Sequence, residues 1–108
     1  MKRQEAEPTL LGSLEEQVML AVVRTGGDAY GMNVRRELER VTGREITIGS
    51  VYATLDRLEA KGLVLSSRGT TAADGAERRI FEVTRAGVRS LTQTRDLRDR
   101  LWLGVTLA

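Results

Sequence analysis

The sequence predicts a mainly α-helical fold that includes one small β-hairpin, an α+β architecture. Four stretches carry apolar residues at the spacing of three and four positions that is typical of amphipathic helices. Two short β-prone runs, residues 63–68 and 78–83, flank a polar, Gly-containing connection that is typical of a hairpin. The length of 108 residues fits one compact domain.

The composition limits the classes of function. The chain has no Cys and no His, so it lacks thiolate metal ligands and the commonest general base. It also has no Gly-rich phosphate loop, and we therefore expect neither an enzyme nor a metal or other cofactor. No apolar run is long enough to span a membrane and the first residues do not resemble a signal peptide, so we expect a cytoplasmic protein.

The first helix is expected after a loose polar tail at residues 1–9. Ser13 and Glu16 fit an S-x-x-E capping box at its start, and Gly26 and Gly27 end it. Apolar residues occupy nearly every side of this helix. Such a helix either lies at the centre of the domain or contacts a second subunit.

A second helix is expected from about Tyr30 to Thr42, with Asp28 as its N-cap and Gly43 as its end. Gly31, near its start, either lets backbone N–H groups approach a phosphate or satisfies a packing constraint beside Tyr30. The inner face of this helix carries an apolar stripe: Tyr30, Val34, Leu38 and Val41.

The stretch Thr47–Gly62 predicts a third helix, after a connector or single strand at residues 44–48. Thr47 is placed to cap its start and Gly62 to follow its end. Val51, Leu55 and Leu58 form its apolar stripe; the side chains expected to face outward are Ser50, Ala53, Thr54, Arg57 and Lys61. Small and hydroxylated residues followed by basic ones suit a helix that enters the major groove of DNA. A solvated face of an ordinary amphipathic helix would look the same.

The predicted hairpin places Phe81 and Val83 on one face of its second strand and basic residues at its base or flank. Those basic residues are Arg68, Arg78 and Arg79. The connection at residues 70–77 is longer than a tight turn, so we expect a mobile tip.

The last helix is expected to start at Thr84 as N-cap and to run towards Gly104. Its apolar positions are Val88, Leu91, Leu97, Leu101 and Val105, with Trp102 beside them. Such a helix is too apolar for a small monomer, which favours a partner surface over packing against its own domain.

The order helix, helix, short strand, helix, strand, basic loop, strand, helix predicts a winged helix-turn-helix, with the hairpin as the wing. We expect this DNA-binding domain at residues 10–84 and a dimerisation helix at residues 85–108. Nearly all cations are Arg, which suits phosphate and guanine contacts, although the net charge is only +2.

Four motifs carry a resemblance to a known family: LGSLEEQVMLAV, AYGMNVRREL, ITIGSVYATLDRLEAKGLV and RRIFEVTRAG. They cover about residues 10–91 and resemble the PadR-like family of bacterial transcriptional regulators. The chain departs from the family in having Arg85 where a Pro is usual. With a single helix after the wing, it is similar to the short subfamily, which dimerises through that helix and the first one.

The resemblance implies a homodimeric repressor that reads an inverted-repeat operator, with the third helix in the major groove and the wing on the flanking backbone. Combined with the outward positions above, the expected DNA-contacting residues are Tyr30, Gly31, Arg35, Gly49, Ser50, Tyr52, Ala53, Thr54, Arg57, Lys61, Arg68, Arg78 and Arg79. The expected dimerisation residues are Leu14, Val18, Val88, Leu91, Leu97, Leu101, Trp102 and Val105. Some short members bind planar drugs at the dimer interface, so Trp102 is either a dimer anchor or a platform for a small planar hydrophobic effector. The alternative function is a winged-helix module that binds a protein and reads no DNA sequence.

Overall fold

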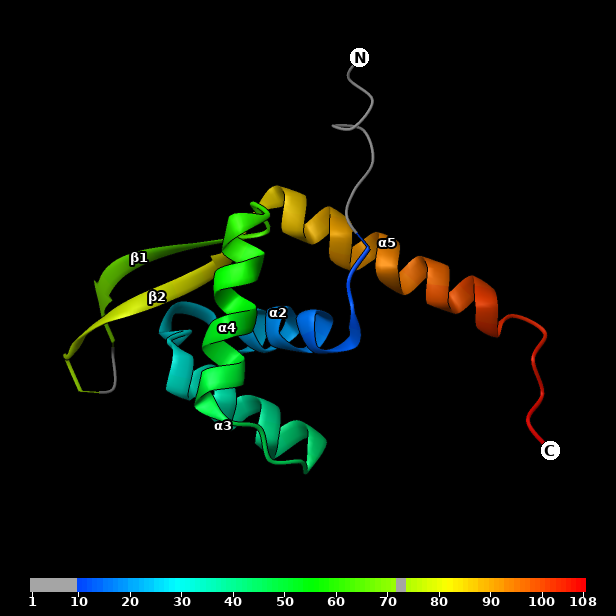
Figure 1. Ribbon diagram of the computed structural model, residues 1–108, viewed down its shortest axis with the longest axis horizontal. Coiled ribbons are helices and arrows are strands. Elements are labelled where there is room, and N and C mark those ends of the chain that lie inside the picture. Colours follow the sequence, from blue (N-terminus) through cyan, green and yellow to red (C-terminus); the bar gives the residue numbers. More distant parts are fainter. Residues whose placement is uncertain (1–9, 72–73) are drawn as a thin grey trace, which may run out of the picture.

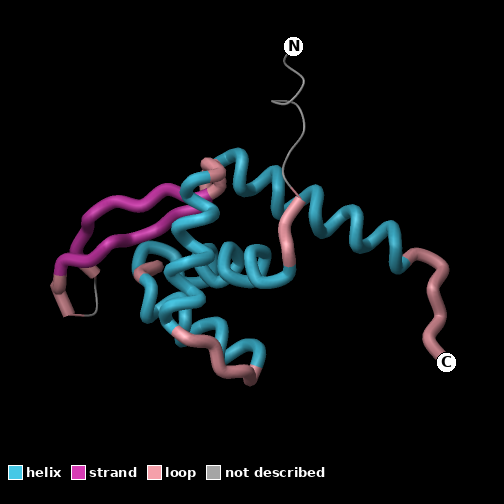
Figure 2. Tube along the Cα trace, viewed as in Figure 1, coloured by secondary structure: helices cyan, strands magenta, loops and turns pink. Residues whose placement is uncertain are grey.

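The computed structural model describes residues 10–71 and 74–108 and confirms the predicted fold class (Figures 1 and 2). In chain order the elements are α2 (Ser13–Thr25), the 3₁₀ turn η1 (Gly26–Asp28), α3 (Gly31–Thr42), α4 (Ile48–Ala60), β1 (Val64–Thr70), β2 (Glu77–Val83) and α5 (Arg85–Trp102). The two strands pair antiparallel, from Val64 opposite Val83 to Thr70 opposite Glu77. The predicted tail at residues 1–9 and part of the predicted mobile tip, residues 72–73, lie outside the described residues.

The helices α2, α3 and α4 form the centre of the molecule, with the hairpin and α5 extending to opposite sides (Figure 1). α5 contacts this centre through Ala86 and Leu91 of its first half and through Arg98, which pairs with Glu16 of α2, and its C-terminal end projects away (Figure 1). No helix in residues 10–71 and 74–108 is both long and apolar enough to cross a membrane.

The core is built almost entirely from aliphatic side chains, as expected for a chain with few aromatics. Every helix of the centre and the hairpin contribute fully buried residues, among them Val18, Met19, Val34, Val51, Leu55, Leu58, Val64 and Phe81. α2 places Val18 and Met19 at 0% exposure, as expected of a helix at the centre of the domain, but it also exposes Leu20 and Val23. Its place in the core therefore accounts for only part of its apolar surface.

The start of α2 differs from the predicted capping box. Gly12 is the N-cap, and Oε1 of Glu15 accepts a hydrogen bond from its N–H group at 3.1 Å. The prediction of Ser13 and Glu16 was therefore wrong by one residue. Glu16 does not cap the helix, because its carboxylate pairs with Arg98 of α5 at 2.7 Å.

The start of α3 also differs, because the short turn η1 intervenes. Tyr30, not Asp28, is the N-cap of α3, and no side chain caps it. The backbone carbonyl of Asp28 instead accepts hydrogen bonds from the Tyr30 N–H and the Asn33 side chain, both at 2.9 Å. The predicted inner position of Val41 is wrong too: this side chain is 53% exposed on the last turn of α3.

Both ends of α4 confirm the sequence prediction. Thr47 Oγ1 accepts the N–H of Ser50 at 3.0 Å, and the connector before it, residues 43–47, forms no strand. At the other end Gly62 has a φ of +76°, its N–H donates to Glu59 O, and the N–H of Leu63 donates to Leu58 O. This pair of bonds is a Schellman motif, which requires the left-handed conformation that Gly adopts without strain.

The remaining boundaries shift by a few residues. The strands begin at Val64 and Glu77 rather than at residues 63 and 78, and β1 continues to Thr70. Thr84 caps α5 as predicted by accepting the N–H of Gly87 at 3.0 Å, but the helix ends at Trp102 instead of reaching Gly104.

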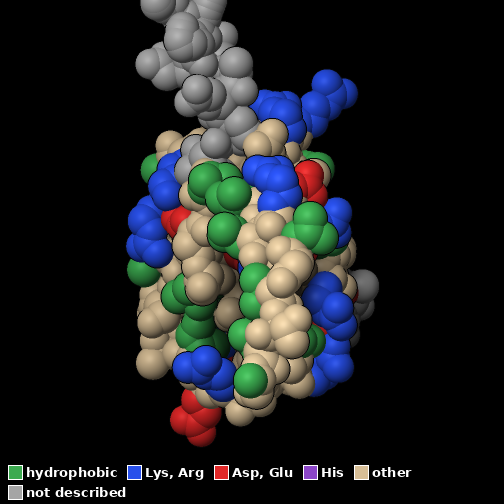
Figure 3. All heavy atoms as spheres, turned by 90° about the vertical axis from the view of Figure 1, so that its right-hand side faces the viewer, with side chains coloured by type: hydrophobic (Ala, Val, Ile, Leu, Met, Phe, Trp, Pro, Cys, Tyr) green, Lys and Arg blue, Asp and Glu red, His purple; other side chains and the backbone are tan. Residues whose placement is uncertain are grey.

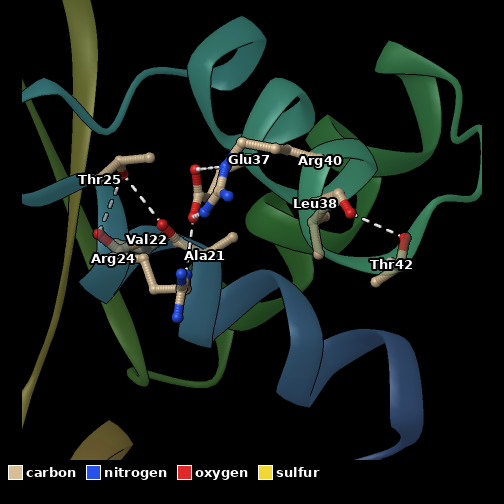
Figure 4. Close-up of polar contacts among 8 residues, drawn as sticks. All are labelled: Ala21, Val22, Arg24, Thr25, Glu37, Leu38, Arg40 and Thr42. Atoms are coloured by element: carbon tan, nitrogen blue, oxygen red, sulfur yellow. Dashed lines mark hydrogen bonds and ion pairs between the residues drawn. The ribbon is translucent and has the colours of Figure 1, made fainter.

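An ion-pair cluster joins α2 to α3 on one side of the core (Figure 4). Oε2 of Glu37 lies 2.7 Å from Arg24 of α2 and 2.7 Å from Arg40 of its own helix. Hydrogen bonds from Arg40 and then Arg24 lower the pKa of Glu37 from 4.5 to about 2. The charged form of this carboxylate is therefore favoured by the folded state.

Gly87, in the first turn of α5, lies close against the backbone at the base of the hairpin. A Cβ at this position would lie 2.2 Å from the carbonyl oxygen of Leu63 and 2.7 Å from a methyl group of Val83. Leu63 O cannot withdraw easily, because it also accepts the Thr84 N–H at 3.0 Å. Gly87 thus sets how closely α5 can pack on the base of the hairpin.

We expect Gly87→Ala to lower the free energy of unfolding by about 1–3 kcal/mol, the usual range for overpacking a tight site. The loss should outweigh the helix propensity that Ala gains over Gly. Urea denaturation at a fixed protein concentration measures it. Gly27→Ala is the control, because a Cβ there would meet nothing within 4 Å. Equal stability of the two variants would contradict the close approach.

We expect Glu37→Gln to destabilise the protein at pH 7 and to make its stability less sensitive to acid. Since the folded pKa is depressed, the contribution of Glu37 is complete above pH 4.5 and is lost as the pH falls towards 2. Wild type and variant should therefore converge in stability across that window. Glu82→Gln is the control, because Glu82 has no ion pair among the described residues. A difference that stays constant with pH would exclude the cluster as its cause.

Candidate nucleic-acid interface

One face of α4 is open to solvent and is lined by small residues. Gly49, Ala53 and Ala60 share this face, since they are four and seven positions apart along the helix, and all are exposed. Ser50 and Arg57 are exposed along one edge of it and Asp56 along the other. With such short side chains in its middle, the backbone of α4 can come close to another molecular surface. We call this set of six residues the open face of α4.

Thr54 does not belong to the open face. The sequence placed it outward, but it is 1% exposed and packs in the core. The reason is helical geometry: residue 54 lies next to the stripe of Val51, Leu55 and Leu58, which is buried against the rest of the domain. Asp56 was missed, although the same helical spacing places it outward.

A single carboxylate holds the two cations near the end of α4. Oε2 of Glu15 lies 2.8 Å from Lys61 Nζ and 3.6 Å from Arg57 Nε. The hydrogen bond from Lys61 is the main reason why the pKa of Glu15 is lowered. Lys61 is therefore engaged by α2, whereas the Arg57 side chain stays 52% exposed with a longer contact.

Arg79 fastens the hairpin to α4 instead of pointing outward. Its Nη2 lies 2.9 Å from Asp56 and 2.7 Å from Glu59, and its Nε donates to Ser66 Oγ at 3.1 Å. The guanidinium carbon also lies 4.7 Å from the centre of the Phe81 ring. Arg79 thus fixes the angle between the hairpin and the helix.

Tyr30 lies between two cations at the start of α3. The guanidinium of Arg78 covers its ring at 4.3 Å, and Arg36 Nη1 donates to its hydroxyl at 3.3 Å. Arg78 also pairs with Asp74 of the hairpin turn at 2.7 Å. The isolated bridge between Tyr30 and Ile80 joins this point to the middle of β2.

Gly31 meets a packing constraint, but its partner is Tyr52 rather than Tyr30. A Cβ on Gly31 would lie 2.2 Å from Cζ of the half-buried Tyr52 ring. The two helices of the helix-turn-helix meet at this glycine.

Arg35 holds the connector between α3 and α4. Its Nε donates to Ile46 O at 2.8 Å, while Glu39 accepts the Ile46 N–H at 3.0 Å. Arg68, by contrast, is the most open of the three hairpin arginines, with its side chain 69% exposed and only a 3.9 Å contact to Glu77. Of the predicted set, the structure therefore leaves Gly49, Ser50, Ala53, Arg57 and Arg68 freely presented.

A second exposed surface lies along α5 and the residues after it. Its large apolar side chains include Leu101 at 70% exposure, Trp102 at 55%, Val88 at 53% and Val105 at 48%. On the face from which α5 projects, apolar side chains occur from top to bottom between cations that lie mostly at the margins (Figure 3). Leu14, Leu91 and Leu97 are half-buried beside it.

Val18 is wrongly placed in the predicted dimer set, because it is fully buried in the core of its own chain. Leu20 and Val23, at 44% and 56% exposure, are the large apolar residues that α2 exposes. The sequence analysis expected apolar surface on α2 beyond the core, but it named Val18, which is buried, instead of Leu20 and Val23.

Comparison with known proteins decides the family. The model of the transcriptional regulator PadR-like family matches residues 19–93. The chain belongs to this family. The transcriptional regulator Rv3488 of Mycobacterium tuberculosis is 36% identical to this chain over 74 residues. The match covers 68% of this chain and 66% of that protein, which is just under two thirds of its length.

Solved structures of other PadR regulators share the fold of this chain. A PadR-like regulator from Bacillus cereus superposes with a TM-score of 0.72 at 18% identity, covering 83% of this chain and 84% of its own. A PadR family regulator from Clostridium difficile gives a TM-score of 0.58 at 20% identity, with coverage of 82% and 86%. The family and these relatives are transcriptional regulators, not enzymes.

Proposed function

We propose that this chain is a DNA-binding transcriptional repressor that works as a homodimer on an inverted-repeat operator. In each subunit α4 enters the major groove and the hairpin lies on the flanking backbone. The observation that carries the proposal is the open face of α4 beside a projecting hairpin, in a chain that belongs to a family of transcriptional regulators. A nucleoid-associated place in the cytoplasm follows from this role.

The open face supports DNA binding through its shape and its donors. An α-helix fits the major groove, and the short side chains of Gly49 and Ala53 let the helix axis come near the base edges. Ser50 can donate to or accept from a base or phosphate, and Arg57 can reach a guanine or a phosphate. Arg68, on the exposed edge of the hairpin, is placed for a phosphate.

The exposed apolar surface of α5 supports a homodimer. A small monomer rarely exposes several large apolar side chains in one region, and burying those of α5 against a second copy removes them from water. A two-fold dimer presents two copies of α4 related by the same axis, which matches an inverted repeat. Ion pairing of Arg98 with Glu16 already joins α5 to α2 at the edge of this surface.

Trp102 belongs to the proposed dimer surface. Its ring is 55% exposed and lies in a shallow hollow with Leu101, Val105 and Leu107. We assign it an anchoring role between subunits. The same flat ring would stack on a planar hydrophobic effector that entered the interface.

The competing function is a winged-helix module that holds a protein partner. Both functions predict a folded chain with an exposed hairpin, but only the repressor predicts tight, salt-dependent binding to specific duplexes. Gel-shift assays at physiological salt with promoter fragments near the gene separate the two. Failure on every fragment would favour the protein-interaction module.

Arg57→Ala should weaken binding to the operator by about 1–3 kcal/mol, because it removes a bidentate donor from the open face. Fluorescence anisotropy with labelled operator and random duplexes measures the effect. Arg89→Ala is the matched control, since it removes the same charge from an exposed position of α5. An unchanged operator affinity for Arg57→Ala would remove Arg57 from the interface.

Leu101→Asp should convert the dimer into monomers and reduce operator affinity, because two half-sites are then read without linkage. Size-exclusion chromatography with light scattering reports the mass. The emission of Trp102, the only Trp in the chain, should shift to longer wavelength as its surroundings become wetter. Leu65→Asp, at a similarly exposed leucine of the hairpin, is the control for assembly. A wild type that is monomeric at micromolar concentration would contradict the dimer.

A further inference from the structure

We infer that Asp56 is a specificity-determining residue that selects cytosine in one base pair of each half-site. In this role its carboxylate accepts a hydrogen bond from the exocyclic amine of that cytosine while Arg79 holds it in place. The inference rests on the proposed DNA-binding function. It assigns to the open face of α4 an acceptor that the basic residues do not provide.

The position of Asp56 makes it prominent on that face. Its side chain is 59% exposed, and its neighbours in the middle of the face, Ala53 and Ala60, end at the β-carbon. A duplex that approached the small residues would therefore meet Asp56 on the hairpin side and Arg57 on the other side. These two side chains have opposite hydrogen-bonding character.

The charge of Asp56 would repel a phosphate backbone, and Arg79, which is shared with Glu59, offsets part of that charge. Arg79 Nη2 donates to Oδ1 of Asp56 at 2.9 Å, and the same guanidinium is held by Glu59 and Ser66. Oδ2 of Asp56 has no hydrogen-bond partner in the part of the chain that the structure describes. The carboxylate is thus oriented by one oxygen and has the other available.

The chemistry of a carboxylate narrows its choice of base. An ionised Asp only accepts hydrogen bonds, so the acceptors of guanine and thymine in the major groove repel it. Adenine offers an amine beside the N7 acceptor, which lies close to any carboxylate that binds the amine. Cytosine presents its N4 amine without a neighbouring acceptor of its own, and it is therefore the base that Asp56 fits best.

Glu59 is a matched comparison because it shares the same arginine without facing the groove. Its side chain is 31% exposed, and its oxygens accept from Arg79, from Ser66 Oγ and from the Ser66 N–H. Arg79 is also the first cause of the lowered pKa of Glu59. Glu59 is therefore a structural carboxylate, and its replacement affects the hold of the hairpin on α4 without changing base readout.

The test is selection of duplexes from a randomised library, followed by affinity measurements on single-base variants of the selected site. We compare wild type, Asp56→Asn and Glu59→Gln. Wild type should select cytosine at one position of each half-site and lose about tenfold or more in affinity when it is replaced, the size expected for one good base contact. Asp56→Asn keeps an oxygen for Arg79 but adds an amide donor, so it should lose that preference and favour adenine. Glu59→Gln should keep the cytosine preference.

The possible outcomes distinguish a failure of the Asp56 inference from a failure of the proposed DNA-binding function. If no protein selects any sequence, the proposed DNA-binding function fails. If wild type and Asp56→Asn select the same base at every position, the function stands and Asp56 reads nothing. If Asp56→Asn weakens binding to all duplexes equally, as Glu59→Gln does, Asp56 only positions the hairpin and the inference is overturned. Circular dichroism confirms that each variant is folded.

Discussion

The burial of Val51, Leu55 and Leu58 fixes how α4 is rotated about its own axis, and the candidate site depends on that rotation. These three side chains are fully buried together with residues from α2 and α3. Because they point inward, the helical repeat places Gly49, Ala53 and Ala60 on the outward side of α4. The Thr47 cap and the Schellman motif at Gly62 then set where the helix starts and stops. A rotation of α4 by one residue, about 100°, would turn the small face towards the domain and move the apolar stripe towards solvent.

Electrostatics around this face are arranged by carboxylates more than by the arginine content. Glu15 engages Lys61, Asp56 and Glu59 engage Arg79, and Asp74 engages Arg78. Each contact takes one cation out of the set that could contact phosphate, and the contacts of Lys61 and Arg79 also connect two elements. Exposed pairs of this kind contribute little stability individually, so their main effect here is geometric. The cations that remain open, Arg57 and Arg68, stand at separate ends of the surface.

The sequence was sufficient for the fold class, the order of elements and the apolar side of α4, because these follow from periodicity, glycine positions and side-chain size. It was less informative wherever two elements compete for one side chain. Glu16 fits a capping box in the sequence, but its carboxylate pairs with Arg98, which lies 82 positions later. Thr54 is polar but lies beside the apolar stripe of α4. The sequence prediction gave its polarity more weight than its angular position around the helix axis, and that position buries it. The roles of Arg35 and Arg79 depend on contacts with residues 11 to 23 positions away, which no local pattern reveals.

Adjacent acidic residues at the first turn of α2 connect two distant parts of the molecule. Glu15 binds Lys61 at the end of α4, and Glu16 binds Arg98 on α5. The same turn therefore carries a link towards the proposed DNA surface and a link towards the proposed subunit contact. The two links are held by neighbouring residues of one helix, although Lys61 and Arg98 are 37 positions apart. This turn of α2 is thus the point at which the end of α4 and the second half of α5 are tied to the same helix.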